Sequence, residues 1–391
     1  MSTADKHAGE IAAFKSAVSQ ADIADLRDRL ARTRWPDAQT VSDWSQGIPL
    51  DYVRDVCAYW AGEYDWGRFE SKLNSFTQGV TTIGGLGIHF IHAPSPEPTA
   101  RPLIITHGWP GSIVEFIDII EPLRNPTAHG GIPEDAYHVV VPSLPGFGFS
   151  GKPTTPGWTI ERIGSAWVEL MRRLGYERFF VQGGDWGAMV ATNMGIAQRQ
   201  AVDGIHINLA ICNPEELIRL GELTTEEQRQ LQKFQYYMEW ENGYSQQQST
   251  RPQTLGYALT DSPAGQCAWI LEKFKAWTDC DGHPENVISR DTLLDNISLY
   301  WFTATAASSA RLYWESFKKL LVDFTLVTVP VAYSSFPEDI FTMTERWART
   351  RYADLRYYGQ PNRGGHFASL EQPSSYVSAV SYTHLTLPTK A

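Results

Sequence analysis

The sequence predicts an α/β fold with a mostly parallel central sheet, a helical insertion and an N-terminal segment that wraps around this core. Between residues 103 and 207, short apolar strand patterns alternate with helix patterns, which is typical of βα units that cover both faces of a sheet. The alternation stops at about Pro214 and resumes at residue 329, and the stretch between is helical and polar. Such an insertion is expected to cap the carboxyl ends of the strands, where ligands bind in sheets of this kind.

Two helices are expected near the N-terminus. Residues 11–36 form an amphipathic pattern that Trp35 and Pro36 end, because a residue before proline avoids the helical conformation. The second helix is expected at residues 50–60.

A β-hairpin is expected after these helices. Residues 80–83 and 88–91 are strand-like and flank a Gly-Gly-Leu-Gly run at residues 84–87. A proline-rich joint comes next, at residues 94–102. Residues 1–98 are therefore expected to form an arm wrapped on the core.

The core is expected in two parts, residues 99–213 and 328–380, on either side of a cap at residues 214–327. Its strands are expected at residues 103–106, 138–141, 178–182, 205–207, 329–333 and 354–358, and its helices at residues 112–123, 160–174, 188–194 and 342–349. Residues 381–391 break the helical spacing of the segment before them. We expect them to be a tail foreign to the native protein, and His384 is given no role.

Composition excludes several classes of function. The net charge of −11 and a pI near 5.4 argue against nucleic acid or an anionic membrane as a partner. No apolar run is long enough to span a membrane, and the first residues lack the layout of a signal peptide. The four cysteines are scattered without metal-binding spacing. We expect a soluble, cytoplasmic protein with reduced thiols and no bound metal.

The strongest chemical signal is Gly183-Gly184-Asp185-Trp186-Gly187. It lies between a predicted strand and a predicted helix, as in a nucleophile elbow, where glycines two residues either side relieve crowding in a strained turn. The central residue is usually Ser, but a carboxylate is ionised at neutral pH and needs no base to attack an sp³ carbon. The plainer alternative is a glycine-rich turn with a solvated Asp185.

A second motif, His107-Gly108-Trp109-Pro110-Gly111-Ser112, comes directly after the first core strand. In elbow hydrolases this loop supplies one backbone N–H of the oxyanion hole, and the residue after the nucleophile supplies the other. These donors would be the N–H groups of Trp109 and Trp186.

A base and its acid partner are expected in the chain order nucleophile, acid, histidine. His366 comes after Gly364-Gly365 and the last predicted strand, at the place of the base. The acid is expected after the preceding strand, where Glu338 and Asp339 both offer a carboxylate. A G-x-G-x-x-G match at Gly146 to Gly151 is rejected as a dinucleotide site, since the prolines after it cannot open the required helix.

These motifs resemble the epoxide hydrolases of the microsomal type, within the α/β-hydrolase superfamily. The resemblance covers nearly the whole chain, from Leu30-Ala31-Arg32-Thr33-Arg34-Trp35-Pro36-Asp37 to Gly364-Gly365-His366-Phe367. It implies an α/β-hydrolase fold in which Asp185 is the nucleophile and Asp339 the acid, with Glu338 as the fallback.

The resemblance also implies two tyrosines of the cap, Tyr244 and Tyr313, that bind the substrate and activate the epoxide oxygen. Trp109 and Trp186 would complete the substrate site. The reaction would need only a small epoxide and water, with no cofactor and no metal. The aromatic residues Trp240, Trp269, Trp301 and Phe302 of the cap favour an apolar substrate. A homodimer is one of the oligomeric states that the sequence leaves open.

Two alternatives remain at this stage. A haloalkane dehalogenase would share the Asp elbow, but it has a halide to hold, so paired N–H donors would matter and cap tyrosines would not. A catalytically silent ligand-binding relative would need neither the triad nor the tyrosines. Diol formation from styrene oxide, against halide release from a bromoalkane, distinguishes these functions.

Overall fold

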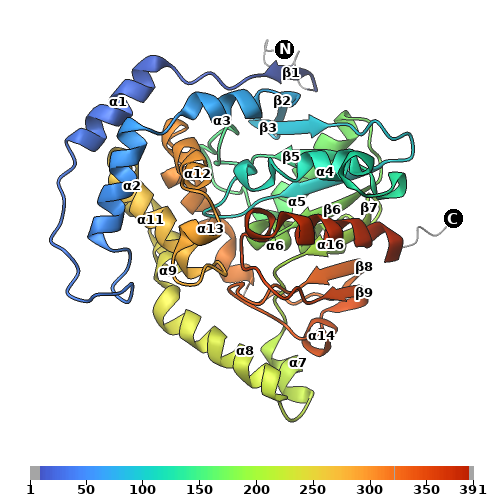
Figure 1. Ribbon diagram of the computed structural model, residues 1–391. Helices are drawn as coiled ribbons and strands as arrows, with labels where there is room; N and C mark the ends of the chain where they lie inside the picture. Colours follow the sequence, from blue (N-terminus) through green and yellow to red (C-terminus); the bar gives the residue numbers. More distant parts are fainter. Residues whose placement is uncertain (1–8, 321, 387–391) are drawn as a thin grey trace.

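A computed structural model describes residues 9–320 and 322–386 and contains a nine-stranded sheet within them (Figure 1). The strands are β1 (Ile11–Phe14), β2 (Gln78–Ile83), β3 (Leu86–Ala93), β4 (Arg101–Thr106), β5 (Tyr137–Pro142), β6 (Phe179–Gly183), β7 (Val202–Ile207), β8 (Val327–Ser334) and β9 (Tyr352–Gly359). Their order is β1-β2-β3-β5-β4-β6-β7-β8-β9. The strands from β5 to β9 pair in parallel, and β1, β2 and β3 extend the sheet through antiparallel pairing.

The sheet is covered by two pairs of helices. The first pair is α5 (Ile160–Arg173) and α6 (Asp185–Ala197), which pack against each other, and α6 lies along the central strands. The second pair is α4 (Ile120–Arg124) and α16 (Pro373–Thr386), on the near side of the sheet in Figure 1. The parallel strands are apolar along most of their length because both faces are covered.

The insertion between β7 and β8 is helical, and its described residues contain no strand. Its helices are α7 (Pro214–Arg219), α8 (Thr225–Tyr236), α9 (Gly243–Thr250), α10 (Pro252–Asp261), α11 (Pro263–Ala276), α12 (Arg290–Phe302) and α13 (Ala306–Leu320). A π-helical turn, Tyr237–Glu241, joins α8 to α9, and the side chain of Tyr237 is buried there.

The N-terminal segment holds the cap from outside. It contains α1 (Gln20–Ala31), α2 (Leu50–Gly62) and α3 (Trp66–Leu73), and both α1 and α2 contact α11. Trp60 donates a buried hydrogen bond of 2.9 Å to Ser298 in α12. The Tyr64 hydroxyl donates to the carboxylate of Asp295 at 2.7 Å, and the Arg68 guanidinium donates to the same carboxylate at 2.6 Å. The arm is thus bound to the cap through polar contacts that are partly shielded from water.

Most expected elements are present, but four differ. Residues 11–14 are a strand rather than the start of a helix, because they pair with β2 in the sheet. Residues 112–123 are not one helix: a 3₁₀ turn at Ile113–Phe116, capped by Ser112, precedes α4. The helix expected at 342–349 is reduced to α14 (Glu345–Ala348).

The fourth difference concerns the end of the chain. The helix does not break after residue 380, since α16 continues to Thr386. The rest of the expected tail, residues 387–391, lies outside the described residues. The division of the chain at residues 98, 213, 327 and 380 stays a prediction.

Replacing Asp295 with Ala should destabilise the protein by about 1–3 kcal/mol, because it leaves the buried Tyr64 hydroxyl without its acceptor, whereas the Arg68 guanidinium is 41% exposed and keeps Asp291 at 3.7 Å. Urea unfolding measures the loss. Asp25→Ala is the control, because Asp25 forms an exposed pair with Arg29 that is worth about 0.5 kcal/mol or less. Equal losses in the two variants would contradict the role given to the arm–cap contacts.

Candidate active site

Asp185 lies in a strained turn between β6 and α6. Its φ is +47°, a conformation that a residue with a side chain adopts only when its surroundings enforce it. A Cβ on Gly187 would lie 1.9 Å from the carbonyl oxygen of Thr106, and one on Gly183 would lie 2.2 Å from the backbone of Gly187. Both glycines are therefore required by the close approach of β6, α6 and the neighbouring β4, as expected for a nucleophile elbow.

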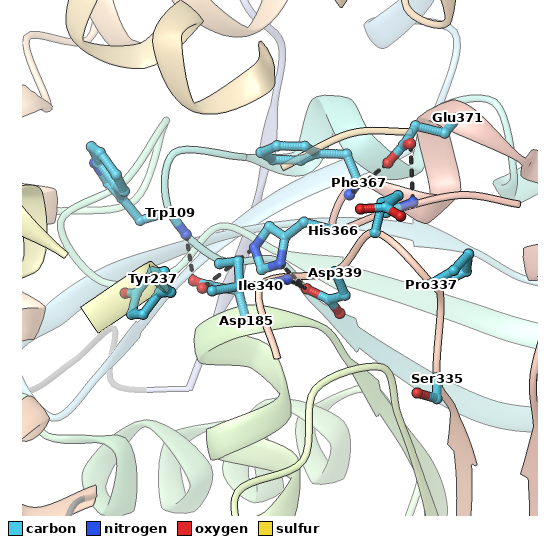
Figure 2. Close-up of polar contacts among 12 residues, drawn as sticks. Trp109, Asp185, Tyr237, Ser335, Pro337, Asp339, Ile340, His366, Phe367 and Glu371 are labelled. Atoms are coloured by element: carbon cyan, nitrogen blue, oxygen red, sulfur yellow. Dashed lines mark hydrogen bonds and ion pairs between the residues drawn. The ribbon is translucent and has the colours of Figure 1, made fainter. Parts of the chain in front are cut away.

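The loop after β4 donates to the Asp185 carboxylate. The Trp109 N–H donates to Asp185 Oδ1 at 2.8 Å (Figure 2). The cap fixes this loop: the Asn296 amide donates to the carbonyl of Pro110 at 2.8 Å, and the Tyr300 hydroxyl donates to that of Gly111 at 2.8 Å. The expected oxyanion-hole loop thus lies against Asp185 and is held there by α12.

Trp186, the second expected donor, is in the first turn of α6, where backbone N–H groups lack an acceptor within the helix. Its side chain is buried and packs edge-on against the ring of Tyr313 at 4.8 Å. Of the two expected oxyanion residues, Trp109 thus bonds to the Asp185 carboxylate, and Trp186 follows Asp185 in the chain.

His366 lies between two carboxylates (Figure 2). Its Nδ1 is 2.6 Å from Asp339 Oδ1, and its Nε2 is 3.4 Å from Asp185 Oδ2. Asp339 is only 1% exposed, and the same oxygen also accepts the N–H of Ile340 at 2.7 Å. Glu338 does not face His366, because its carboxylate contacts Lys233 at 3.1 Å near the surface. The structure thus brings Asp185, His366 and Asp339 together and leaves Glu338 outside.

The electrostatics of this trio favour the charged imidazole. Burial lowers the pKa of His366, but the negative charges of Asp339 and Asp185 outweigh it and raise the pKa to about 10. An imidazolium between two carboxylates compensates their charges in a place with little access to water.

Tyr244 and Tyr313 lie beside this trio, as expected. Their rings pack edge-on at 5.8 Å, and the ring of Trp109 stacks on Tyr244 at 5.0 Å with an interplanar angle of 9°. Burial, supported by nearby charges, raises the pKa of both hydroxyls well above its ordinary value, so both carry their protons. The Tyr313 hydroxyl has no hydrogen-bond partner among the described residues.

Two further residues of the site are absent from the sequence-based prediction. The Tyr237 hydroxyl lies 3.0 Å from that of Tyr244, and burial raises its pKa to about 12. Tyr237 lies in the π-helical turn and Tyr244 in the helix after it, so no regular helical spacing in the sequence connects the two residues. Trp277, at the end of α11, packs edge-on against His366 at 5.2 Å. It was not predicted because it is far from the catalytic motifs in the sequence.

The cap aromatics chosen from the sequence lie elsewhere. Trp240 is 66% exposed. Trp301 lies under the guanidinium of Arg29, and Phe302 packs against Trp66 of the arm. Trp269 is half-buried beside Gln248. The apolar walls near Asp185 come instead from Trp109, Trp186, Tyr244, Trp277 and Tyr313.

The described residues hold no group of three or more His, Cys, Asp or Glu side chains placed to bind a metal ion. In the same part of the chain, no helix combines the length and apolarity needed to traverse a bilayer.

Comparison with known families and proteins gives a consistent result. Residues 11–116 match the family described as the epoxide hydrolase N terminus, and residues 101–249 match the alpha/beta hydrolase fold. A candidate epoxide hydrolase of Stigmatella aurantiaca is 52% identical over 94% of this chain and 83% of its own length. Epoxide hydrolase 1 of Oryctolagus cuniculus is 37% identical over 92% of this chain and 85% of its own length.

Solved structures agree with this. The crystal structure of juvenile hormone epoxide hydrolase from the silkworm Bombyx mori superposes with a TM-score of 0.88 at 30% identity, covering 97% of this chain and 95% of the other. The epoxide hydrolase of Aspergillus niger superposes with a TM-score of 0.85 at 30% identity, covering 97% of each chain.

Asp185→Asn should lower the pKa of His366, because it removes one of the two negative charges that raise it. NMR titration of the His366 imidazole measures this pKa directly. Intact-mass spectrometry checks that the introduced asparagine has not deamidated to aspartate. Charged His366 contributes stability that is complete below about pH 6.5 and is lost as pH rises through its raised pKa. In the variant this loss should be smaller and should be complete at a lower pH, because the folded-state pKa of His366 falls while its unfolded-state pKa is unchanged. An unchanged His366 pKa would contradict the coupling.

Proposed function

Because this chain belongs to the epoxide hydrolase family and is an enzyme that hydrolyses epoxides, we propose that it does so through an ester between the substrate and Asp185. The observation that carries this proposal is the position of the Asp185 carboxylate, which lies between the Trp109 N–H at 2.8 Å and His366 Nε2 at 3.4 Å. A carboxylate in that place is a suitable nucleophile for carbon, and its neighbours suit the later hydrolysis of an ester.

Ring opening is the first half of the reaction. An oxygen of Asp185 attacks a ring carbon, that carbon's bond to the epoxide oxygen breaks, and the oxygen receives the electron pair. Tyr244 and Tyr313 donate hydrogen bonds to this oxygen, and one of them gives it a proton. Their raised pKa keeps them protonated before the substrate arrives. The Tyr237 hydroxyl can in turn donate to Tyr244 and stabilise the charge that develops there.

The ester changes the charge on His366. Before reaction, two carboxylates hold the imidazole protonated; the ester removes the charge of Asp185, so the pKa of His366 falls. Its proton passes by way of solvent to the tyrosine that lost one. His366 becomes neutral at the stage when a base is needed.

Ester hydrolysis is the second half. Neutral His366, oriented by Asp339, takes a proton from water, and the water oxygen attacks the ester carbonyl. The N–H groups of Trp109 and Trp186 stabilise the oxyanion. The bond between the carbonyl carbon and the substrate oxygen breaks, and this oxygen takes the second proton of the water from the new carboxyl group, which releases a vicinal diol. Asp185 regains its charge and His366 keeps the proton, so the starting pair is restored.

The aromatic walls favour an apolar epoxide as the substrate. Two hydroxyl donors from the cap match an epoxide oxygen better than a halide, which favours this reaction over dehalogenation. The complete Asp185–His366–Asp339 constellation argues against a silent ligand-binding relative.

We also propose a cytoplasmic location, based on the acidic net charge and the scattered cysteines. A homodimer is one possible oligomeric state, and gel filtration can test it.

His366→Gln separates the two halves of the reaction. Ring opening should survive in part, because Asp185 is already charged and the tyrosines remain, whereas ester hydrolysis should stop for want of a base. Mixing the variant with styrene oxide should therefore trap an alkyl-enzyme. Intact mass should rise by one whole substrate, and the label should map to the peptide containing Asp185.

The trapping experiment has two controls. A double variant that combines Asp185→Asn with His366→Gln should not gain the mass of styrene oxide. A bromoalkane offered to the His366→Gln variant should give no adduct, whereas a dehalogenase would retain the alkyl group without bromine. Diol formation at the wild-type rate, or a label on another residue, would refute the ester mechanism.

Tyr244→Phe and Tyr313→Phe should each slow ring opening by on the order of 10²–10³, the usual cost of losing a donor to developing charge. Single-turnover formation of the ester is the measurement, made in the His366→Gln background. Tyr257→Phe is the control, because this hydroxyl is on the exposed surface of α10. If the double variant reacted as fast as the parent, the assignment of the cap tyrosines would be wrong.

A further inference from the structure

Glu371 is a buried acid for which the proposed reaction has no role. It ends the short helix α15 (Ala368–Glu371), close after His366 in the chain, and is 8% exposed. Its carboxylate points back to the backbone on both sides of His366 (Figure 2): Oε2 accepts the N–H of Gly365 at 3.0 Å, and Oε1 accepts the N–H of Phe367 at 3.1 Å. One carboxylate therefore accepts the N–H groups of the two residues on either side of His366.

The same carboxylate reaches the cap. Its Oε2 also accepts the N–H of Asp279 at 2.8 Å, from the segment after α11. In that segment the carbonyl of Trp277 accepts the N–H of His366 at 2.8 Å, and the carboxylate of Asp279 accepts the N–H of Gly364 at 3.0 Å. The loop carrying His366 is thus bound to the end of α11 through both main-chain and carboxylate bonds.

A buried carboxylate is a costly way to satisfy three N–H groups. Burial raises the pKa of Glu371 to about 7 despite these donors, so ionising it in the folded protein is harder than in an exposed glutamate. Backbone carbonyls or water satisfy most turns at lower cost. Residues that lower stability in this way are expected where function requires them.

We propose that Glu371 is a positioning residue for His366, which fixes the base against the end of the cap for its attack on the ester intermediate. The role rests on the two-step reaction proposed above. His366 must keep Nδ1 on Asp339 while Nε2 faces a water molecule beside the ester carbonyl. Glu371 accepts one bond from the residue on each side of His366 and a third from the cap. These three bonds restrict any rotation or shift of His366 that would misalign Nε2.

The inference predicts a selective defect. Ring opening uses Asp185 and the cap tyrosines, none of which bonds to Glu371, so it should proceed as before. Ester hydrolysis uses His366 as the base and should suffer. A misplacement of about 1 Å can cost on the order of 100-fold in a catalysed step.

Glu371→Gln is the test, because the amide keeps the shape but offers one oxygen. If that oxygen serves Gly365 and Asp279, the NH₂ group faces the Phe367 N–H, donor against donor. Rapid-quench intact-mass analysis with styrene oxide gives both rates. We expect ester formation within about threefold of wild type and ester hydrolysis slower by about 10- to 100-fold, so that kcat and KM fall together.

Controls separate positioning from a general loss of structure. Glu345→Gln alters an exposed glutamate paired with Arg349 and should change neither rate. Asp279→Asn keeps the backbone N–H that Glu371 accepts but weakens a second link between the same loop and the cap, the bond from the Gly364 N–H to the Asp279 carboxylate. It should slow hydrolysis in the same direction, which covers the case in which Glu371→Gln folds poorly. Equal slowing of both steps, or normal ester hydrolysis in folded Glu371→Gln and Asp279→Asn, would overturn the proposal. Absence of label in His366→Gln would instead refute the ester mechanism itself.

Discussion

The candidate site depends on one buried imidazole held between two carboxylates. Two such charges are costly to remove from water unless each meets a cation or several donors. His366 lies 2.6 Å from Asp339 and 3.4 Å from Asp185, and backbone N–H groups of Ile340 and Trp109 complete the arrangement. The three side chains come after β6, β8 and β9, whose carboxyl ends lie at one edge of the parallel sheet. The strand order therefore decides whether these charges can compensate one another at all.

The cap also holds the catalytic loops in place. The loop of Trp109 is bound to α12 through Asn296 and Tyr300, and the loop of His366 is bound to the end of α11 through the carbonyl of Trp277. The N-terminal arm binds the outer side of the same two helices. A change in the arm would therefore reach the site through the cap, and this gives a physical reason for an arm that contributes no side chain to the catalytic trio.

Local patterns were enough to predict the parts of the site that lie within a few residues of one another. The turn at Asp185, the loop at Trp109 and the hairpin of β2 and β3 all carry their own glycines and flanking strands. The strand at residues 11–14 was missed because its partner, β2, is distant in the chain, and pairing outweighed a helical pattern. Trp277 was missed for the same reason, because it is distant in the chain from His366, and the bond of Glu371 to the cap at the Asp279 N–H also joins distant residues. The choice of Asp339 over Glu338 likewise required the structure, because the sequence does not say which of two adjacent side chains points toward His366.

The hydroxyl of Tyr313 shows how the site favours one kind of substrate. It is buried among the rings of Trp109, Trp186 and Tyr244, and no described residue accepts its proton. A buried donor without an acceptor costs about 1–3 kcal/mol, and a ligand oxygen that accepts its hydrogen bond recovers that free energy. An apolar molecule without such an oxygen gains only contact with the rings. As the ring opens, the oxygen becomes more negative and the same bond strengthens, so the donor contributes more to the transition state than to binding.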